Sequence, residues 1–368
     1  MPTELDDRVI EVRARLLAHF DRHARDLAWR RTSDPYAIWV SEVMLQQTRV
    51  ETAEPYFDRW MDRLPTVRSL AEADLETVLK LWEGLGYYGR ARRLHQAARV
   101  VCSRYGGVLP TDPRELGGLP GVGRYTAGAV ASIAFGHVVP AVDGNVRRVL
   151  SRLLDMAAPS ASELELIAGS LVDPERPGDF NQALMELGAT VCARSGPDCA
   201  ACPLAEHCLA CARGTQTRRP APKGRREVPA AEFAVAIVVR SHPVGEDRVA
   251  LMRRPEDGML GGLWEFPAEA LRDGNAPEEA ARRAASRVAL GATLPVAERR
   301  PPVDHRYTHL KATYHPYRFV VGEADTRDVA DPAGELVWAD RSTLLELPLP
   351  RAQRLIATDA GLQEHDTG

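Results

Sequence analysis

The residues that could do chemistry begin with a single acid at the end of an uncharged run. No Asp, Glu, Lys or Arg occurs between Thr126 and Val142, and the next residue is Asp143. A segment without charges is expected to be mostly buried, so this one carries its carboxylate to the edge of a core. That placement suits an acid that acts on a bound molecule.

A second acid, Glu42, stands on an apolar helix face. Asp34 is a good N-cap and Pro35 suits the first helical position, which predicts a helix beginning there. The side chains within one turn of Glu42 are mostly apolar: Ile38, Trp39, Leu45 and Gln46. Glu42 is therefore either a surface residue at the edge of this face or a desolvated acid. Desolvation would raise its pKa and make it a proton donor near neutral pH.

Five of the six cysteines lie between residues 192 and 211. Four of them follow the spacing Cys192-x6-Cys199-x2-Cys202-x5-Cys208. In a reducing compartment such a group indicates metal or cluster ligation rather than disulfides. Structural zinc usually shows two tight pairs, and only Cys199 and Cys202 are close, so the spacing favours a [4Fe–4S] cluster and leaves zinc as the alternative. Cys211 and Cys102 are assigned no role.

A glycine-rich turn, LPGVG at residues 119–123, lies between two short predicted helices, the second starting at Arg124. We expect Gly121 and Gly123 to adopt backbone conformations that other residues avoid. Amide groups ahead of the second helix could then point at a phosphate. Two helices around this turn are typical of a helix-hairpin-helix, which clamps a DNA backbone without reading its sequence.

Length and charge are compatible with a nucleic-acid partner. The 368 residues allow two or three domains with real cores, and the net charge of −4 hides an uneven distribution. Residues 84–111 hold five arginines and no acid, and residues 213–226 hold six basic residues and no acid. Tyr87 and Tyr88 lie on a glycine-rich turn in the first stretch and could stack on bases or belong to the core. No signal peptide or membrane-spanning run is visible, which predicts a cytoplasmic protein.

The elements that must position these residues change character along the chain. Helical patterns are expected over 4–28, 66–83, 89–105 and 160–191. Residues 213–229 form a Pro-rich basic linker. Beyond it, strands are expected at 231–239 and 248–254, a helix over 277–289, and later strands in YHPYRFVV and ELVWAD. The sequence therefore predicts a helical region followed by a separate α/β domain.

Several long segments together resemble the adenine DNA glycosylases of the MutY type. They are WVSEVMLQQTRVET, GLGYYGRARRL, LPGVGRYTAGAV, VDGNVRRVLSRL, FNQALMELGA and the four-cysteine loop, in the family's order. The resemblance implies a multidomain chain. An all-α helix-hairpin-helix glycosylase region with a [4Fe–4S] cluster loop would fill 1–212, followed by the 213–229 linker, a Nudix-like 8-oxoguanine recognition domain over 230–360 and a tail over 361–368. Within the first region it implies a six-helix barrel with the hairpin over about 30–140, and a cluster subdomain from 1–29 plus 141–212.

The resemblance also implies an activity. It is removal of adenine mispaired with 8-oxoguanine or guanine in duplex DNA, by hydrolysis of the N-glycosidic bond in base excision repair. Glu42 would protonate adenine N7, and Asp143 would stabilise the oxocarbenium ion, supported by Tyr125 and Asn145. Burial would keep Glu42 protonated and hydrogen-bond donors would keep Asp143 ionised. A monomer suffices, associated with the nucleoid through DNA.

The remaining site residues implied by the resemblance fall into four sets. The adenine pocket would be formed by Trp29, Arg30, Leu45 and Gln182. The DNA-binding surface would comprise Gln46, Gln47, Tyr87, Gly121 and Gly123, with Gln47 and Tyr87 as wedges. The turn that reads 8-oxoguanine would be Tyr307, Thr308 and His309, where the family has Phe-Ser-His. The cluster ligands would be Cys192, Cys199, Cys202 and Cys208, one cluster per chain.

Three other functions are weighed against this one. Endonuclease III-like lyases carry a Schiff-base lysine where this chain has Tyr125, and a phenol cannot form an imine. A Nudix hydrolase needs acids for Mg²⁺ where this chain has Ala285, Val288 and Ala289. A non-catalytic DNA-binding module has no reason to keep both Glu42 and Asp143.

Overall fold

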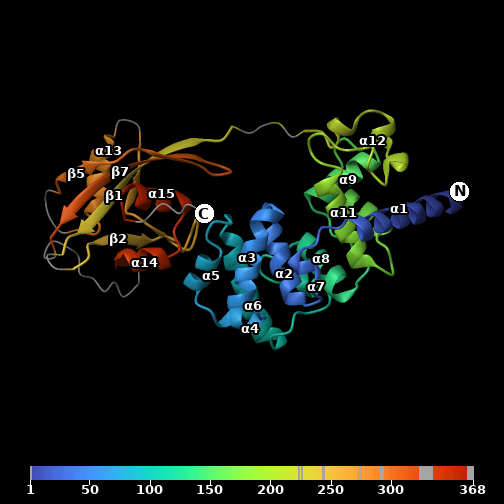
Figure 1. Cartoon of the computed structure of the whole chain (residues 1–368), viewed down its shortest axis with the longest axis horizontal. Coiled ribbons are helices and arrows are strands. Elements are labelled where there is room, and N and C mark those ends of the chain that lie inside the picture. The colour runs from blue at the N-terminus through green and yellow to red at the C-terminus, as the bar shows by residue number, and fades with distance from the viewer. Residues whose placement is uncertain are drawn as a thin grey trace. The chain divides into compact units, whose positions relative to one another are not determined.

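The computed structural model describes residues 2–222, 224, 227–242, 245–272, 275–289, 294–322 and 335–362. The chain divides into two compact units. Met1–Ala73 and Arg93–Gly224 form the helical unit, and Asp74–Arg92 and Arg225–Gly368 form the sheet unit. Figure 1 shows the helical and sheet-containing parts. Across the described ranges, no helix is long and apolar enough to span a bilayer.

The helical unit starts its helices where the sequence supplies caps. The side chains of Asp34, Asp112 and Asp143 accept hydrogen bonds from amides in the first turns of α2, α7 and α9. The longer helices outside the cysteine loop are α1 (Pro2–His23), α2 (Pro35–Leu45), α3 (Val50–Arg63), α4 (Val67–Glu72), α6 (Gly89–Tyr105), α7 (Pro113–Gly117), α8 (Arg124–Phe135), α9 (Gly144–Leu153), α10 (Ala161–Leu171) and α11 (Pro177–Thr190). Short helical turns are η1 (Ala28–Arg30), η2 (Ala205–His207), α12 (Leu209–Ala212) and η3 (Gln216–Arg218).

One core of this unit joins the N-terminal helix to helices far along the chain. Leu16 of α1 shares a buried cluster with Leu150 of α9, Leu164 of α10 and Phe180 of α11. The expected helix over 4–28 ends at His23 instead, and the expected helix over 66–83 is two helices. The break in the second comes because Asp74 caps a new helix, α5 (Leu75–Leu81), which belongs to the sheet unit.

The sheet unit is built on two long parallel strands. β1 (Ala230–Arg240) pairs with β7 (Lys311–Val321) in the register Ala230 to Lys311. Shorter strands pair antiparallel around them in the order β3-β2-β1-β7-β5, with β4 on β1, β6 on β7 and β8 on β2. Their bounds are β2 (Arg248–Arg253), β3 (Trp264–Glu265), β4 (Ala268–Ala270), β5 (Val296–Arg299), β6 (Val303–Arg306) and β8 (Leu336–Ala339). The sheet is therefore mixed.

Helices cover both faces of this sheet, so β1 is buried on both sides. Val235 and Ile237 face the core under α14 (Arg341–Glu346) and α15 (Arg351–Asp359), and Ala234 and Ala236 face the core under α13 (Pro277–Ala285). Figure 1 shows α13 and α14 on opposite sides of the strands. A continuous apolar run is what a strand buried on both faces requires.

The positions at which a Nudix hydrolase would carry acids lie inside the α13 core. Ala285, Val288 and Ala289 are at most 2% exposed and pack against the apolar face of β1. They supply no oxygen ligand, so these residues do not fit a Mg²⁺ ion. The fold is Nudix-like, without this part of a Nudix metal site.

Candidate active site

Helix α8 fixes the segment that carries Asp143. It is buried from Thr126 to Ser132, as the uncharged run predicts, but burial weakens beyond Ile133 and Val138 is 51% exposed. The backbone of α8 passes close to the segment at Gly128, where an added Cβ would lie 2.2 Å from the Pro140 carbonyl oxygen. The run is therefore buried over its first half and mostly half-buried over its second.

A buried amide on α11 also holds this segment. Asn181 is 1% exposed. Its Oδ1 accepts from the Ala141 amide at 3.0 Å, and its Nδ2 donates to the Val139 carbonyl at 2.9 Å and to Ser132 Oγ at 2.8 Å. Asn181 thus positions the chain just before Asp143, although it is far from it in sequence.

The Asp143 carboxylate accepts hydrogen bonds from both backbone and side-chain amides. Its Oδ1 caps α9 by accepting from the Val146 amide at 2.7 Å, and its Oδ2 accepts from Asn145 Nδ2 at 2.9 Å. Burial raises the pKa of Asp143, and these donors oppose the increase without cancelling it. The donors favour the ionised form, as expected, but desolvation has the larger effect on the pKa of Asp143.

Glu42 is a buried acid, 6% exposed, which excludes the surface interpretation. It accepts a short hydrogen bond from the Tyr125 hydroxyl, which also lies 3.2 Å from Met185 Sδ. Burial raises the pKa of Glu42 to about 7, and the nearby Asp143 charge adds to this increase. The Tyr125 hydroxyl and Arg30 lower it only in part, so Glu42 is half-protonated near neutral pH.

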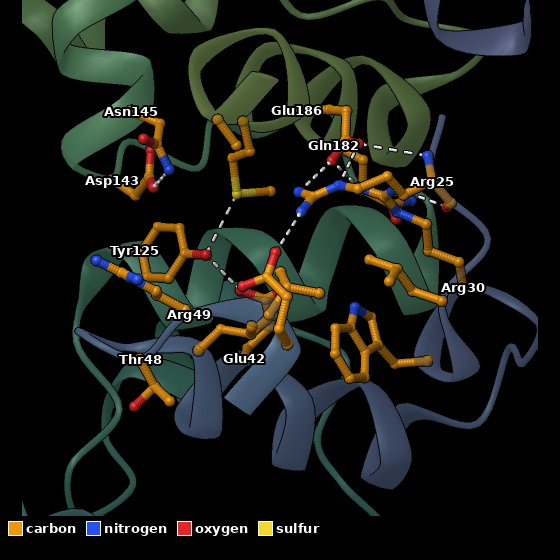
Figure 2. A pocket seen from close by; sticks show the side chains of 17 residues that line it. Arg25, Arg30, Glu42, Thr48, Arg49, Tyr125, Asp143, Asn145, Gln182 and Glu186 are labelled. Carbon is orange, nitrogen blue, oxygen red and sulfur yellow. Dashed lines mark hydrogen bonds and ion pairs between the residues drawn. The ribbon is translucent and has the colours of Figure 1, made fainter. Parts of the chain in front are cut away.

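These residues line one cavity of about 380 Å³ (Figure 2). The predicted residues that it brings together are Trp29, Arg30, Glu42, Leu45, Tyr125, Asp143, Asn145 and Gln182. In Figure 2 the Tyr125 ring lies between Glu42 and Asp143, and both acids raise the pKa of its phenol together with burial. The cavity therefore places a proton donor and a second carboxylate around one space.

Sequence reasoning missed a buried ion pair in the same wall. Glu186 is 6% exposed and accepts from Arg25 Nε at 2.7 Å and from Arg30 Nη2 at 2.8 Å. Burial raises its pKa, but the two guanidinium groups outweigh burial and lower the pKa to about 2. A signal existed, because Glu186 lies four residues after Gln182 on the same helix face.

The glycine-rich turn between α7 and α8 has the expected helix-hairpin-helix geometry at one of its two glycines. Gly121 has φ of +75°, and an added Cβ would lie 2.6 Å from Arg93 Cβ. Gly123 has an extended backbone with φ of −85°, so the prediction of a special conformation is wrong there. Gly123 acts instead as an N-cap without a side chain, which leaves the first amides of α8 open to an anion.

The two predicted wedge residues share an unusual backbone. Gln47 has φ of +60° and Tyr87 has φ of +49°, a region that side chains other than glycine rarely adopt. Both side chains are exposed, Tyr87 by 42%. Neighbouring Gln46 donates to Thr126 Oγ1 at 3.1 Å. Of the two tyrosines on the turn, Tyr88 is buried and belongs to the core, whereas Tyr87 is exposed. Strain of this kind concentrates at functional sites.

The four predicted cluster ligands gather around one small cavity. Cys192, Cys199, Cys202 and Cys208 line it together with Cys211, and all are free thiols. Burial raises the pKa of Cys199 to about 11, and the neighbouring thiols contribute. Within the ranges described above, no group of three or more His, Cys, Asp or Glu has the arrangement of a formed metal site. The donor set nevertheless fits a cationic iron–sulfur group, which would stabilise thiolates brought this close.

Two arginines connect the cysteine loop to α9. Arg152 is 3% exposed and donates to Cys192 Sγ at 3.2 Å and to the Ala193 carbonyl at 2.8 Å. Arg148 donates to the Cys192 carbonyl at 2.8 Å and to Asn145 Oδ1 at 2.9 Å. The start of the cysteine loop is thus held by the helix that Asp143 caps.

The turn Tyr307-Thr308-His309 connects β6 to β7. The Tyr307 amide donates to the Leu310 carbonyl at 2.8 Å, and the Tyr307 hydroxyl lies 2.9 Å from that of Tyr314. Thr308 Oγ1 lies 2.6 Å from the Tyr87 hydroxyl, within the sheet unit. His309 Nε2 lies 3.1 Å from Met259 Sδ. Tyr307 points into the domain, and Thr308 meets the predicted wedge.

Two known protein families match separate parts of the chain. Residues 40–174 match the HhH-GPD superfamily base excision DNA repair proteins, and residues 235–359 match the NUDIX domain. A solved thermostable thymine-DNA glycosylase has a TM-score of 0.54 and 28% identity, covering 57% of this chain and 99% of its own. A complex of endonuclease III with DNA, at a TM-score of 0.50 and 24% identity, covers 59% and 99% and shares the fold. Fold and site thus define a base excision repair protein of the helix-hairpin-helix class with a Nudix domain.

Curated relatives narrow the class. The adenine DNA glycosylase of Mus musculus is 38% identical over an alignment that covers 90% of this chain and 75% of the relative. That of Homo sapiens is 39% identical over an alignment that covers 89% of this chain and 70% of the relative. The chain belongs to the adenine DNA glycosylase family.

Proposed function

We propose that this chain hydrolyses the N-glycosidic bond of adenine opposite 8-oxoguanine, or opposite guanine, in duplex DNA. The observation that carries the proposal is the placement of two acids in one cavity, with the pKa of Glu42 raised to about 7. Adenine is a poor leaving group as an anion, so its release needs a proton. Membership of the adenine DNA glycosylase family indicates that the excised base is adenine. The adenine would reach the cavity by flipping out of the duplex, which is easier at a mispair.

Each acid has its own task. Glu42, buried and half-protonated, protonates adenine N7. Asp143 stabilises the oxocarbenium ion that develops as the bond breaks, electrostatically or covalently, as in glycosidases that use two carboxylates. Asn145 holds Asp143 Oδ2, and the Tyr125 hydroxyl donates to Glu42 and orients it. Because a tyrosine occupies the position of a lyase lysine, the enzyme leaves the DNA backbone intact.

The flipped base would occupy the cavity between Trp29, Arg30, Leu45 and Gln182. Trp29 offers an apolar surface, 6% exposed, against which an adenine can stack. Arg30 is held by Glu186 at 2.8 Å, so its guanidinium has a fixed direction. Glu186 therefore joins the pocket as a positioning residue for Arg30.

The rest of the DNA surface follows from the same proposal. The open amides after Gly123 and the turn at Gly121 would bind a backbone phosphate. Gln47 and Tyr87 would wedge into the stack beside Gln46. The turn Tyr307, Thr308 and His309 would read 8-oxoguanine, and its hydroxyl and imidazole offer a donor and an acceptor. The protein would act as a cytoplasmic monomer on nucleoid DNA.

The four cysteines Cys192, Cys199, Cys202 and Cys208 would hold one [4Fe–4S] cluster. When bound, it would shape this loop as a structural group. Arg152 and Arg148 hold Cys192, the first ligand of the loop, against α9. They orient this ligand whether or not the cluster takes part in electron transfer. The purified protein should show an iron–sulfur absorption band, and a colourless protein that contains zinc would contradict this assignment.

The first test concerns Glu42. Because Glu42→Gln keeps the hydrogen bond from Tyr125 but carries no acidic proton, it should abolish adenine release while binding to the mispair stays nearly intact. Single-turnover excision and binding to a labelled duplex with A opposite 8-oxoguanine measure the two effects. Normal excision by the variant would contradict the role of Glu42.

The second test separates this function from its relatives. Duplexes with A opposite 8-oxoguanine, A opposite G, or thymine glycol are incubated with the protein, with and without alkali. We expect cleavage only at adenine and only after alkali. Strand cleavage without alkali at thymine glycol would support a lyase instead. Tyr125→Lys should introduce strand cleavage through an imine between the lysine and the sugar, which borohydride reduces to a stable amine that links protein and DNA.

A further inference from the structure

The sheet unit contains a segment from early in the chain, and this segment ends at the predicted wedge. Asp74–Arg92 includes α5 and the turn 82–88, which carries Tyr87. Its helix α5 is bound by the C-terminal part of the unit: Trp264 Nε1 donates to Glu76 Oε2 at 2.8 Å. Gly262 also approaches Leu79, at 3.3 Å from an added Cβ.

A half-buried ion pair holds the base of the turn. Arg354 of α15 donates to Glu83 through Nε at 2.6 Å and Nη2 at 3.1 Å, a bidentate geometry. The two side chains are 19% and 17% exposed. Lys80 Nζ adds a third hydrogen bond to Glu83 at 2.7 Å. A half-buried bidentate pair fixes the direction of both side chains better than a single exposed ion pair does.

The end of α14 completes this arrangement. Arg354 donates to the carbonyls of Leu344 at 2.5 Å and of Leu347, and Lys80 donates to that of Leu345 at 2.5 Å. The last carbonyls of a helix have no partners within it and carry its negative end, which favours cations there. Arg354 therefore donates both to the end of α14 and to Glu83. Its hydrogen bonds to α14 keep the guanidinium in place, so they restrict movement of the turn at Glu83.

The turn transmits this position to Tyr87. Gly84, Gly86 and Tyr87 all have positive φ, at +102°, +72° and +49°, so the chain between Glu83 and Tyr87 is tightly folded. Trp82 Nε1 and Arg90 Nη2 both donate to the Gly86 carbonyl, at 3.0 and 3.1 Å. Such a fold passes a displacement at one end to the other. Thr308 then meets the Tyr87 hydroxyl at 2.6 Å.

We propose that Arg354, acting through Glu83, is a positioning residue for Tyr87, so that α15 sets how the wedge enters DNA opposite the excised adenine. The inference rests on the proposed function, because Tyr87 acts as a wedge only on a duplex. Arg354 contacts Glu83 and the end of α14, and it is not among the residues that line the cavity of Glu42 and Asp143. Its effect is therefore on opening of the stack, before any bond breaks.

The test uses full-length protein and a duplex with 8-oxoguanine opposite 2′-fluoro-2′-deoxyadenosine, which resists excision. A 2-aminopurine beside 8-oxoguanine reports unstacking by its fluorescence. Arg354→Met and Glu83→Gln should reduce the fluorescence increase and weaken binding about tenfold, because each removes a half-buried bidentate pair with charge-assisted hydrogen bonds. Arg351→Met, which removes an exposed arginine of the same helix, should match wild type.

A double-mutant cycle separates positioning from general stability. If Arg354 acts through Tyr87, then Arg354→Met should have little further effect in a Tyr87→Ala background. Losses that add in full would overturn the proposal. In the free protein, amide exchange over 82–88 should be faster in Arg354→Met than in Arg351→Met, and equal rates would also overturn it. Should Arg354→Met fold poorly, Glu83→Gln carries the same cycle.

The wild-type control distinguishes failure of the proposed function from failure of the role proposed for Arg354. If wild type neither prefers this mispair nor excises adenine from the unmodified duplex, the proposed function fails and this inference fails with it. If wild type behaves as proposed while Arg354→Met matches Arg351→Met, only the role of Arg354 is wrong.

Discussion

At the scale of residues, two glutamates in one cavity differ in charge because of their neighbours. Glu42 and Glu186 are equally buried, at 6% exposure each. Burial raises the pKa of Glu42 to about 7, and two arginines lower that of Glu186 to about 2. The sequence allowed both outcomes for Glu42, because an acid on an apolar face can lie at its edge. It did not reveal Glu186, whose partner Arg25 is 161 residues away.

The pKa of Glu42 predicts how excision depends on pH. Protonated Glu42 is the active form, so the single-turnover rate should fall about tenfold per pH unit above about 7. On the acid side the rate should fall as Asp143 becomes protonated, at a pH above its ordinary range because burial raises its pKa. The pH–rate profile should therefore be bell-shaped, and its two apparent pKa values describe Glu42 and Asp143 as a coupled pair. A rate that rises from pH 7 to 9 would rule out Glu42 as the donor.

The ion pairs of Glu186 predict a loss of stability on neutralisation. Glu186→Gln leaves the guanidinium of Arg30, itself 16% exposed, without its counter-charge, and should cost about 3 kcal/mol of unfolding free energy in urea. Glu165→Gln, which removes an exposed pair with Arg124, should cost less than about 1 kcal/mol. Because the folded-state pKa of Glu186 is lowered, its contribution is complete above about pH 4.5 and disappears as pH falls through about 2. Equal losses in the two variants would contradict this account.

At the scale of elements, helix starts were predictable and the limits of burial were not. The Asp34 cap predicted the start of α2 at Pro35, and the glycine-rich turn predicted the start of α8 at Arg124, because both signals lie within a turn of the helix. The uncharged run was expected to be mostly buried, but absence of charge does not specify a packing partner, and Val138 is 51% exposed. Gly123 was misread for a similar reason, since a glycine in a turn can be needed for its lack of a side chain rather than for its φ.

The close passage of α8 at Gly128 gives the next prediction. Gly128→Ala would place a methyl group 2.2 Å from the Pro140 carbonyl oxygen, and the segment that carries Asp143 must then move. We expect a loss of about 3 kcal/mol in unfolding free energy together with slower excision. Gly117→Ala on α7, where the nearest atom is 3.9 Å away, should change stability by less than about 1 kcal/mol. A stable and fully active Gly128→Ala protein would show that α8 does not fix this segment.

At the scale of the whole molecule, the compact units do not follow the order of the sequence. The expected boundary placed all residues before 213 in the helical region, whereas Asp74–Arg92 packs in the sheet unit. Sequence patterns identified α5 as helical but not its partner, because an amphipathic helix shows that it needs an apolar surface without showing which one. The contacts through Glu76 and Glu83 depend on residues near the end of the chain.

Truncation tests this organisation. A chain that ends at residue 222 loses every C-terminal partner of α5, so Glu83 is left without Arg354 and Leu79 without its cover. Amide exchange over 74–92 should become fast, and thermal unfolding should begin at a lower temperature than in the full chain. Full-length protein cut once after residue 222, with both pieces present, is the matched control and should keep slow exchange. Unchanged protection of 74–92 in the truncated chain would contradict the assignment.

The mixed membership of the sheet unit also sets an order of events on the ribosome. Residues 74–92 leave the exit tunnel long before α15 and the β6–β7 turn are made, so α5 waits with its docking side uncovered during most of synthesis. Pairing over such a sequence distance is slow and exposes apolar surface to other chains in the meantime. Nascent chains stalled shortly before residue 341 should therefore be the species that chaperones hold most strongly, and release should coincide with the emergence of Arg354.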